Sequence, residues 1–256
     1  RAAPRQRIRL GARRDGRIVA AIHETWSQTS RFDHMPALQN ELTSHMYGIE
    51  NYRSDTRLVR LDTQTPGFMR GPHEMSAAFA FEGAIDELAV KLGADPVELR
   101  LRNDTDRDPI SKKPFSSRHL AQCLRRGAEL IRWSQRNPEP RSMRGADGSF
   151  IGLGVAAGAY KASTAPAVAR VKAGADGVVE ASVGVHEMGQ GIRTALALAV
   201  SQELGVAPEA VRLTLGDTIA PPQHVTAGSW GTATAVPPVK AAAAELRRRL
   251  VELARG

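Results

Sequence analysis

One segment of the chain combines residue types that could hold an anionic ligand. A β-type run ends at a Gly189-Gln190-Gly191 turn, and a helical pattern follows at once. Glycines permit a tight turn and the close approach of a ligand, and free N–H groups at a helix N-terminus attract an anion. The Gln190 amide can both donate and accept hydrogen bonds. The pattern indicates an anionic ligand at a strand-to-helix junction, with a plain tight connection as the alternative.

Two further loops precede predicted helices and add donors of the same kind. Residues 68–74 read FMRGPHE, and residues 226–234 read TAGSWGTAT. With the Gly-Gln-Gly turn they offer backbone N–H groups, hydroxyls, one amide and one arginine. In a single pocket, this set suits a large polyanionic cofactor that carries phosphates and is held without covalent bonds.

Other catalytic motifs are absent from the sequence. It contains no His-Glu-x-x-His, no Walker A loop and no Gly-x-Ser-x-Gly. His23, His34 and His45 are eleven residues apart, a spacing that suits no common ligand cluster. His186 and Glu187 could form an acid–base pair, but neighbours on a strand point to opposite faces.

The composition is that of a soluble globular protein. The chain has 256 residues, 42% hydrophobic and 24% charged, enough for one large or two ordinary domains. No run approaches about 18 apolar residues, so no membrane span is expected. The single cysteine, Cys123, excludes an internal disulfide and an all-cysteine metal site, and we expect it to be a small core residue. The net charge of +8 is spread along the chain, which favours solvated helix faces and no nucleic-acid partner.

Hydrophobic periodicity predicts an α+β fold, because strands and helices are mixed without regular βαβ alternation. Strands are expected over residues 7–10, 17–23, 57–62, 169–172, 178–185 and 211–215. Helices are expected over residues 76–92, from 95, from 116 or 117, from the Gly-Gln-Gly turn to 205, and over 239–254. Residues 27–50 are polar and irregular, with a short helix around 38–46. The Pro- and Gly-rich stretch 134–149 is expected to be a linker or a long surface loop.

Five segments carry a resemblance to one known family. They read QTSRFD at 28–33, TPGFMRGP at 65–72, EGAIDELA at 82–89, DPVELRLRN at 95–103 and EMGQG at 187–191. Jointly, they make the chain resemble part of the molybdenum-binding large subunit of the xanthine dehydrogenase and aldehyde oxidase family. The bacterial multi-subunit members are the most similar. The resemblance implies mixed sheets with packed helices in two partial molybdopterin-binding sub-domains, residues 1–133 and 150–256.

The resemblance also implies which residues contact the cofactor. The Gly-Gln-Gly turn would contact molybdopterin, the arginine loop would lie beside the molybdenum, and the loop before the last helix would hold the pterin phosphate or its nucleotide. The relatives indicate the cytosine dinucleotide form. No protein ligand to the metal is expected, because the dithiolene of the pterin carries it. The cofactor contacts assigned in this way are Arg70, Gly71, Gly189, Gln190, Gly191, Thr226, Gly228, Ser229 and Thr232.

Two residues depart from the family pattern. His73 stands where the family usually has glycine, so its side chain could crowd the metal or supply a proton donor. Trp230 stands where a smaller polar residue is usual, and it could narrow the phosphate loop.

Family members hydroxylate a C–H bond next to a heteroatom or an aldehyde carbonyl, with water as the oxygen source. Their base is a glutamate near the far C-terminal end of the subunit. That motif and the N-terminal glycine-rich loop are absent, and Glu187 lies in the cofactor turn instead. We therefore expect no catalytic residue in this chain, which would be inactive alone and part of a larger or split subunit.

The resemblance further implies an iron–sulfur subunit and an FAD subunit as electron-accepting partners. The substrate would be an aldehyde or a xanthine-like heterocycle. We expect a cytoplasmic location, and the periplasm stays open because the chain begins with Arg1 rather than Met. The alternative is a non-catalytic remnant that serves as an assembly or interaction module.

Overall fold

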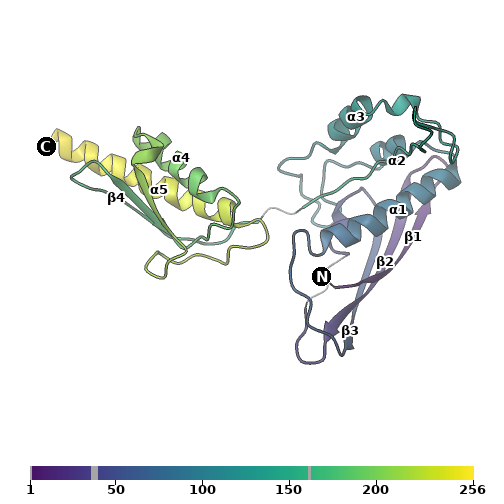
Figure 1. Cartoon of the computed structure of the whole chain (residues 1–256), viewed down its shortest axis with the longest axis horizontal. Helices are drawn as coiled ribbons and strands as arrows, with labels where there is room; N and C mark the ends of the chain where they lie inside the picture. The colour runs from purple at the N-terminus through teal and green to yellow at the C-terminus, as the bar shows by residue number, and fades with distance from the viewer. Residues whose placement is uncertain (1, 36–39, 161–162) are drawn as a thin grey trace. The chain divides into compact units, whose positions relative to one another are not determined.

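A computed structural model describes residues 2–35, 40–160 and 163–256. The chain forms two compact units, unit 1 (Arg1–Tyr160) and unit 2 (Lys161–Gly256) (Figure 1). The stretch 134–149, expected to be a linker or a surface loop, lies inside unit 1. The two molybdopterin-binding sub-domains predicted over residues 1–133 and 150–256 are defined by the cofactor that they would bind, and their boundaries stay a prediction. Within the described residues, no helix is long and apolar enough to cross a membrane.

Unit 1 contains a three-stranded sheet in the order β1 (Arg5–Ala12), β2 (Ile18–Ser30) and β3 (Asn51–Leu61). β1 and β2 form an antiparallel hairpin from two of the expected strands, and β3 runs parallel to β2. β2 continues seven residues beyond the predicted end at residue 23. The sequence hides this extension because its inner face carries buried hydroxyls rather than apolar groups, on Thr25, Ser27 and Thr29.

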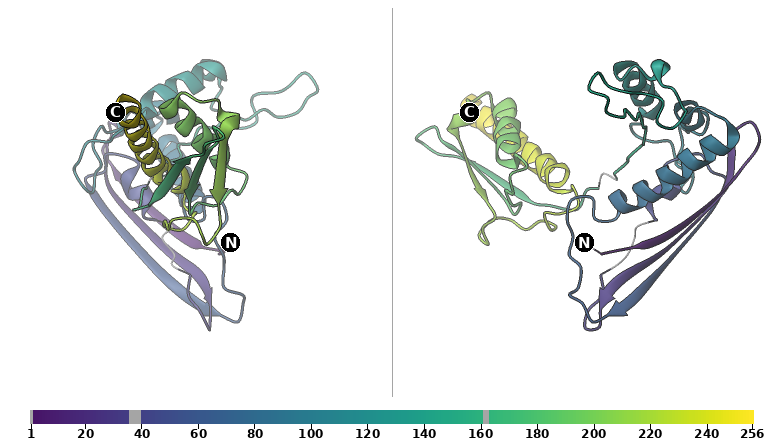
Figure 2. Two further views of the ribbon diagram at one scale, coloured as in Figure 1. Left: turned by 90° about the vertical axis from the view of Figure 1, so that its left-hand side faces the viewer. Right: turned by 45° about the vertical axis from the view of Figure 1, so that its right-hand side comes forward.

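The helix α1 (Glu74–Leu92) covers one face of this sheet (Figure 2). Of the apolar stripe predicted at helical spacing, Phe81 and Ile85 are buried, and Ala89, which was not part of that stripe, is buried with them. They pack in one cluster with residues of β2 and of the segment 46–49. Gly93 ends the helix in the left-handed conformation with φ 61°, the usual role of a C-terminal glycine.

A buried ion pair joins α1 to the short helix α2 (Pro96–Arg102). The Arg100 guanidinium is fully buried, and its Nε donates to Glu82 Oε2 at 2.8 Å. The Tyr47 hydroxyl and the Ala157 N–H also donate to the Glu82 carboxylate, at 2.8 and 2.7 Å. Asp95 caps α2 at the residue where a helix was expected to begin, since its Oδ1 accepts from the Val97 N–H at 2.8 Å. These contacts hold four separate segments of unit 1 around one carboxylate.

The remaining helical segments of unit 1 are η1 (Leu42–His45), α3 (Leu120–Leu130) and η2 (Trp133–Gln135). The helix predicted over 38–46 falls partly on residues 36–39, outside the described residues, and η1 occupies its second half. The prediction of a core position for Cys123 is wrong: its side chain is exposed on α3. Leu124, the next residue, is the one that turns inward against Val97 and Trp133.

Unit 2 repeats the strand pairing of unit 1. β4 (Ala169–Ala173) and β5 (Val179–Val183) form a hairpin, and β6 (Val211–Leu215) runs parallel to β5. α4 (Ile192–Leu204) and η3 (Pro208–Ala210) connect β5 to β6, and α5 (Gly231–Arg255) ends the chain. The buried core joins the three strands to both long helices.

The helix α5 begins eight residues before its predicted start at residue 239. Two consecutive prolines, Pro237 and Pro238, lie inside it, and prolines normally indicate a helix boundary. Here the first turns are kept helical by burial, because Ala235, Val239 and Ala243 are all fully inaccessible in the core of unit 2. Tertiary packing therefore outweighs the local preference of the prolines.

We predict that Arg100→Met destabilises the chain by about 3–5 kcal/mol, because it leaves the Glu82 carboxylate buried without its cation. The free energy of unfolding in urea measures this loss. The matched control is Arg248→Met, which breaks an exposed pair with Glu245 and should leave the stability nearly unchanged. The double variant Glu82→Leu/Arg100→Met should recover much of the loss, and equal destabilisation by Arg100→Met and Arg248→Met would contradict the assignment.

A second prediction concerns pH. His23 is fully buried, with its ring nitrogens 2.9 Å from Thr43 Oγ1 and 2.8 Å from Gln6 Oε1, and burial lowers its pKa from 6.5 to about 4. The unfolded chain therefore binds a proton before the folded chain does. Stability that is present above pH 6.5 is lost as the pH falls towards 4, by roughly 3 kcal/mol from this group.

Urea unfolding of His23→Gln at the two pH values should show a correspondingly smaller loss. The exposed His34 provides the control, and His34→Gln should lose stability on acidification as the wild type does. Identical pH dependence in all three proteins would show that another group controls the acid response.

Candidate functional site

The Gly-Gln-Gly turn lies between β5 and α4, as predicted. Gly189 and Gly191 both adopt left-handed backbone, with φ 88° and 79°. Apart from the adjacent residues, no atom of the described residues lies within 4 Å of the position that a Cβ would take at either glycine. The backbone conformation thus accounts for both glycines, and the space beside them is open.

The N–H groups of this turn are not free, in contrast to the prediction. The Glu187 carboxylate curls back and accepts from the Gly189 N–H at 2.8 Å, the Gly191 N–H at 3.3 Å and the Arg193 N–H at 3.0 Å. These bonds, the one from Arg193 foremost, hold the pKa of Glu187 below its usual range. The site at the N-terminus of α4 therefore already contains an anion, supplied by the chain itself.

The Gln190 side chain closes the turn from the other side. Its Nε2 donates to the His186 carbonyl at 2.7 Å, and its Oε1 accepts from the Met188 N–H at 2.6 Å. An amide nitrogen carries two hydrogens, so Gln190 keeps one donor for a ligand. The internal bonds fix the direction of that donor.

Thr226 connects this turn to the loop that precedes α5. Its buried Oγ1 accepts from the His186 N–H at 3.0 Å and lies 3.2 Å from His186 Nδ1. A Cβ on Gly231 would come within 3.1 Å of Thr226 Cγ2, so the start of α5 packs closely against the loop. The two predicted cofactor loops of unit 2 are therefore side by side. His186 and Glu187 do not form an acid–base pair, because each side chain bonds to a different partner.

The loop before α5 presents open donors. Gly228 and Ser229 have left-handed backbone, with φ 57° and 61°, and no side chain caps the N-terminus of α5. Ser229 and Thr232 are exposed, and within the described residues their hydroxyls make no hydrogen bond. Trp230 packs against His224, with ring centroids 4.5 Å apart, and its indole nitrogen would lie 3.2 Å from a Cβ at Gly228. The tryptophan thus limits the room on one side of the loop.

The predicted arginine loop belongs to unit 1 and leads into α1. Arg70 and Gly71 both have positive φ, 22° and 61°, an uncommon conformation for an arginine. The side chain of Arg70 is exposed. His73 lies edge-on to Phe68, with ring centroids 5.7 Å apart. That this loop shares one pocket with the two loops of unit 2 stays a prediction.

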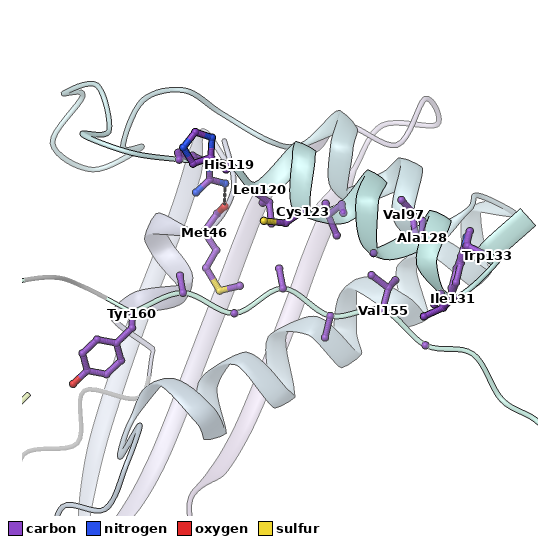
Figure 3. A pocket seen from close by; sticks show the side chains of 18 of the residues that line it. Met46, Val97, His119, Leu120, Cys123, Ala128, Ile131, Trp133, Val155 and Tyr160 are labelled. Carbon is purple, nitrogen blue, oxygen red and sulfur yellow. Dashed lines mark hydrogen bonds between the residues drawn. The ribbon is translucent and has the colours of Figure 1, made fainter. Parts of the chain in front are cut away.

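A cavity in unit 1 lies apart from the predicted site residues, and the described residues contain no metal-binding cluster. In the part of the chain that the structure describes, no group of three or more His, Cys, Asp or Glu side chains could hold a metal ion. A cavity of about 560 Å³ lies between α3 and the extended segment 154–160, with Cys123, Ile131 and Val155 among its lining residues (Figure 3). No residue of the three predicted loops lines this cavity.

Two family models match the chain, and both are described as a molybdopterin cofactor-binding domain. They cover residues 1–104 and 126–256. The chain is thus built from molybdopterin cofactor-binding domains.

Relatives define the family more narrowly. The chain is 38% identical over 254 residues to the aldehyde oxidoreductase molybdenum-binding subunit PaoC of Escherichia coli strain K12, covering 98% of this chain and 34% of that protein. It is 27% identical to the putative xanthine dehydrogenase molybdenum-binding subunit XdhA of the same strain, covering 94% of this chain and 34% of that protein. The chain belongs to the xanthine dehydrogenase and aldehyde oxidase family of molybdenum-binding subunits, and it spans about a third of the length of these relatives.

Solved structures have the same fold. Quinoline 2-oxidoreductase from Pseudomonas putida 86 matches with a TM-score of 0.83 at 22% identity, over 96% of this chain and 34% of that chain. Aldehyde oxidoreductase from Desulfovibrio gigas matches with a TM-score of 0.77 at 21% identity, over 96% and 28% of the two chains. The predicted α+β class of mixed sheets with packed helices is confirmed.

The Glu187 cap was missed by sequence reasoning, and it generates a prediction. Glu187→Ala should expose the Gly189, Gly191 and Arg193 amides to solvent and speed their hydrogen exchange several-fold. Amide exchange followed by NMR measures this at each position. Glu180→Ala changes an exposed carboxylate on β5 and serves as the control. Unchanged exchange at all three amides in Glu187→Ala would show that the carboxylate does not protect them.

Proposed function

We propose that this chain is the cofactor-holding portion of a molybdenum hydroxylase that oxidises aldehydes or N-heterocycles, with water as the oxygen source. The observation that carries the proposal is the pairing of two loops in unit 2. One is a rigid Gly-Gln-Gly turn with open space beside its glycines, and the other is an uncapped helix start with two free hydroxyls. The Thr226–His186 hydrogen bonds hold these loops together.

The donors available suit a ligand with a phosphate at one end and a hydrogen-bonding ring system at the other. The phosphate would lie at the start of α5, where backbone N–H groups and the Ser229 and Thr232 hydroxyls are available. The ring system would lie along the Gly-Gln-Gly turn, where Gln190 offers its remaining amide hydrogen. Molybdopterin meets both requirements, and the Glu187 carboxylate keeps its phosphate away from α4.

Arg70 would supply positive charge to the same cofactor from the loop before α1. The positive φ values of Arg70 and Gly71 bend the backbone of the loop sharply at this point. His73, beside Phe68, is a titratable side chain of the same loop. The cytosine dinucleotide form of the cofactor is part of the proposal, on the similarity to bacterial relatives.

The bound cofactor would supply a metal-held hydroxyl nucleophile and accept the electrons of the oxidation. The residues of this chain would bind and orient it, and the base that activates the nucleophile would come from outside these 256 residues. We therefore propose that the isolated chain is inactive. Iron–sulfur and FAD subunits would carry the electrons away, in line with relatives whose names specify a molybdenum-binding subunit. The cytoplasmic location stays a prediction.

The decisive experiment measures molybdenum and pterin in the complete subunit, assembled with its natural partners. Ser229→Ala/Thr232→Ala should reduce the molybdenum-to-protein ratio at least about tenfold, because two charge-assisted hydrogen bonds to phosphate are lost. The double variant Thr63→Ala/Thr218→Ala, at exposed hydroxyls outside the three predicted loops, should keep the wild-type ratio. A folded, fully assembled wild type without molybdenum would leave only an assembly module.

A further inference from the structure

The second face of the sheet in unit 1 collects arginines from three strands. The register places Arg5 opposite Trp26 and Trp26 beside Arg57, and it places Arg9 opposite Ile22 and Ile22 beside Arg53. Paired residues of neighbouring strands lie on the same face, so these side chains share one surface. We call it the basic sheet face, defined by Arg5, Arg7, Arg9, Arg53 and Arg57 around Trp26.

This face is uncovered within the described residues of unit 1. α1 lies on the opposite face, where Ala21 and His23 are buried against Phe81, and Figure 2 shows no helix on the outer side. The side chains of Arg7, Arg9 and Arg53 are 54%, 59% and 68% exposed. The regular alternation of exposed and half-buried residues along β1 places every one of its arginines outward.

The basic sheet face carries an excess of positive charge. Its five guanidinium groups face two carboxylates, Glu24 and Asp55, which occupy the middle row of the sheet. Glu24 lies 3.9 and 3.7 Å from the guanidinium groups of Arg7 and Arg9, and Asp55 lies 3.0 Å from Arg53. Three positive charges therefore remain unbalanced on one sheet face. The spread of charge along the sequence favoured solvated helix faces, whereas these arginines gather on a sheet.

The chemistry of the face favours the carboxylates of an acidic protein over the phosphates of a nucleic acid. The guanidinium groups of Arg7 and Arg57 both lie over the Trp26 ring, 5.7 and 5.8 Å from its centroid. The ring is therefore engaged by cations rather than open for a stacked base. Glu24 and Asp55 also interrupt the face with negative charge, which a continuous phosphate backbone would meet unfavourably. Separated carboxylates that bind individual arginines in a bidentate manner fit this surface better.

We propose that the basic sheet face docks an acidic surface of another polypeptide chain, with arginine–carboxylate pairs arranged around Trp26. This inference goes beyond cofactor binding, involves no residue of the three predicted loops, and can fail or succeed independently of them. Docking through the basic sheet face would raise the rate of association with an acidic partner and select it over other proteins, because charge complementarity at an interface acts chiefly on association rate and specificity.

The test uses the full chain and a short oligoglutamate peptide as the acidic probe. Arg5→Gln/Arg9→Gln/Arg57→Gln should weaken peptide binding at least about tenfold, measured by titration at low salt. The matched control, Arg125→Gln/Arg141→Gln/Arg255→Gln, removes the same charge from exposed positions elsewhere and should change affinity less than about twofold. Equal weakening in both triple variants would overturn the proposal, because it would reflect net charge alone.

Tryptophan fluorescence locates the probe without altering the arginines. Peptide binding should change the emission of the wild type and of the double variant Trp133→Phe/Trp230→Phe, and Trp26→Phe should remove the change. An emission change that persists in Trp26→Phe would place the peptide elsewhere and contradict the proposal. Single-stranded oligodeoxythymidylate that binds more tightly than oligoglutamate, and depends on Trp26, would overturn it in favour of a nucleic-acid surface.

Discussion

The buried pair between Glu82 and Arg100 is the contact on which the rest of unit 1 depends. A carboxylate and a guanidinium are costly to remove from water, so every remaining lone pair and proton must find a partner. Tyr47 and the Ala157 N–H complete the bonds of Glu82, and the Pro96 carbonyl accepts from Arg100 at 3.0 Å. Helices and extended segments that are distant in sequence must therefore pack around the same ion pair. This requirement explains physically why the two segments EGAIDELA and DPVELRLRN occur as a pair.

The candidate site depends on the same requirement that polar groups find hydrogen-bond partners. His186, at the end of the β5 run, has its N–H satisfied by the Thr226 hydroxyl, and this fixes the loop that begins α5. The turn before α4 is closed by Gln190 and Glu187. These internal polar contacts act together with the buried core, in which Ile192 and Ala235 lie, to position the two helix starts. Such contacts set directions as well as distances, which suits a site that must orient a ligand.

Much of the fold could be predicted from local patterns, and the failures have identifiable physical causes. The α1 stripe, the Asp95 cap and the closing glycines depend on nearby residues only. The extension of β2 could not be predicted, because its buried face is made of threonine and serine. The early start of α5 required knowledge of burial that outweighs two prolines. The bonds of Glu187 reach only as far as Arg193, but they depend on the exact geometry of the turn, which the apolar pattern does not show. The gathering of arginines on one sheet face depends on strand register, which no local pattern contains.

The Glu187 carboxylate gives the start of α4 a built-in selectivity. Because it is tethered two residues from the first amide that it binds, its effective concentration at the turn is millimolar or higher. A dissolved sulfate or phosphate ion must therefore displace this local carboxylate before it can bind the same N–H groups. A large ligand that is anchored at several points competes better with the carboxylate. Each contact that it makes raises the local concentration of the rest of the ligand. The turn thus rejects small anions and reserves its open side for a ligand with more than one point of attachment.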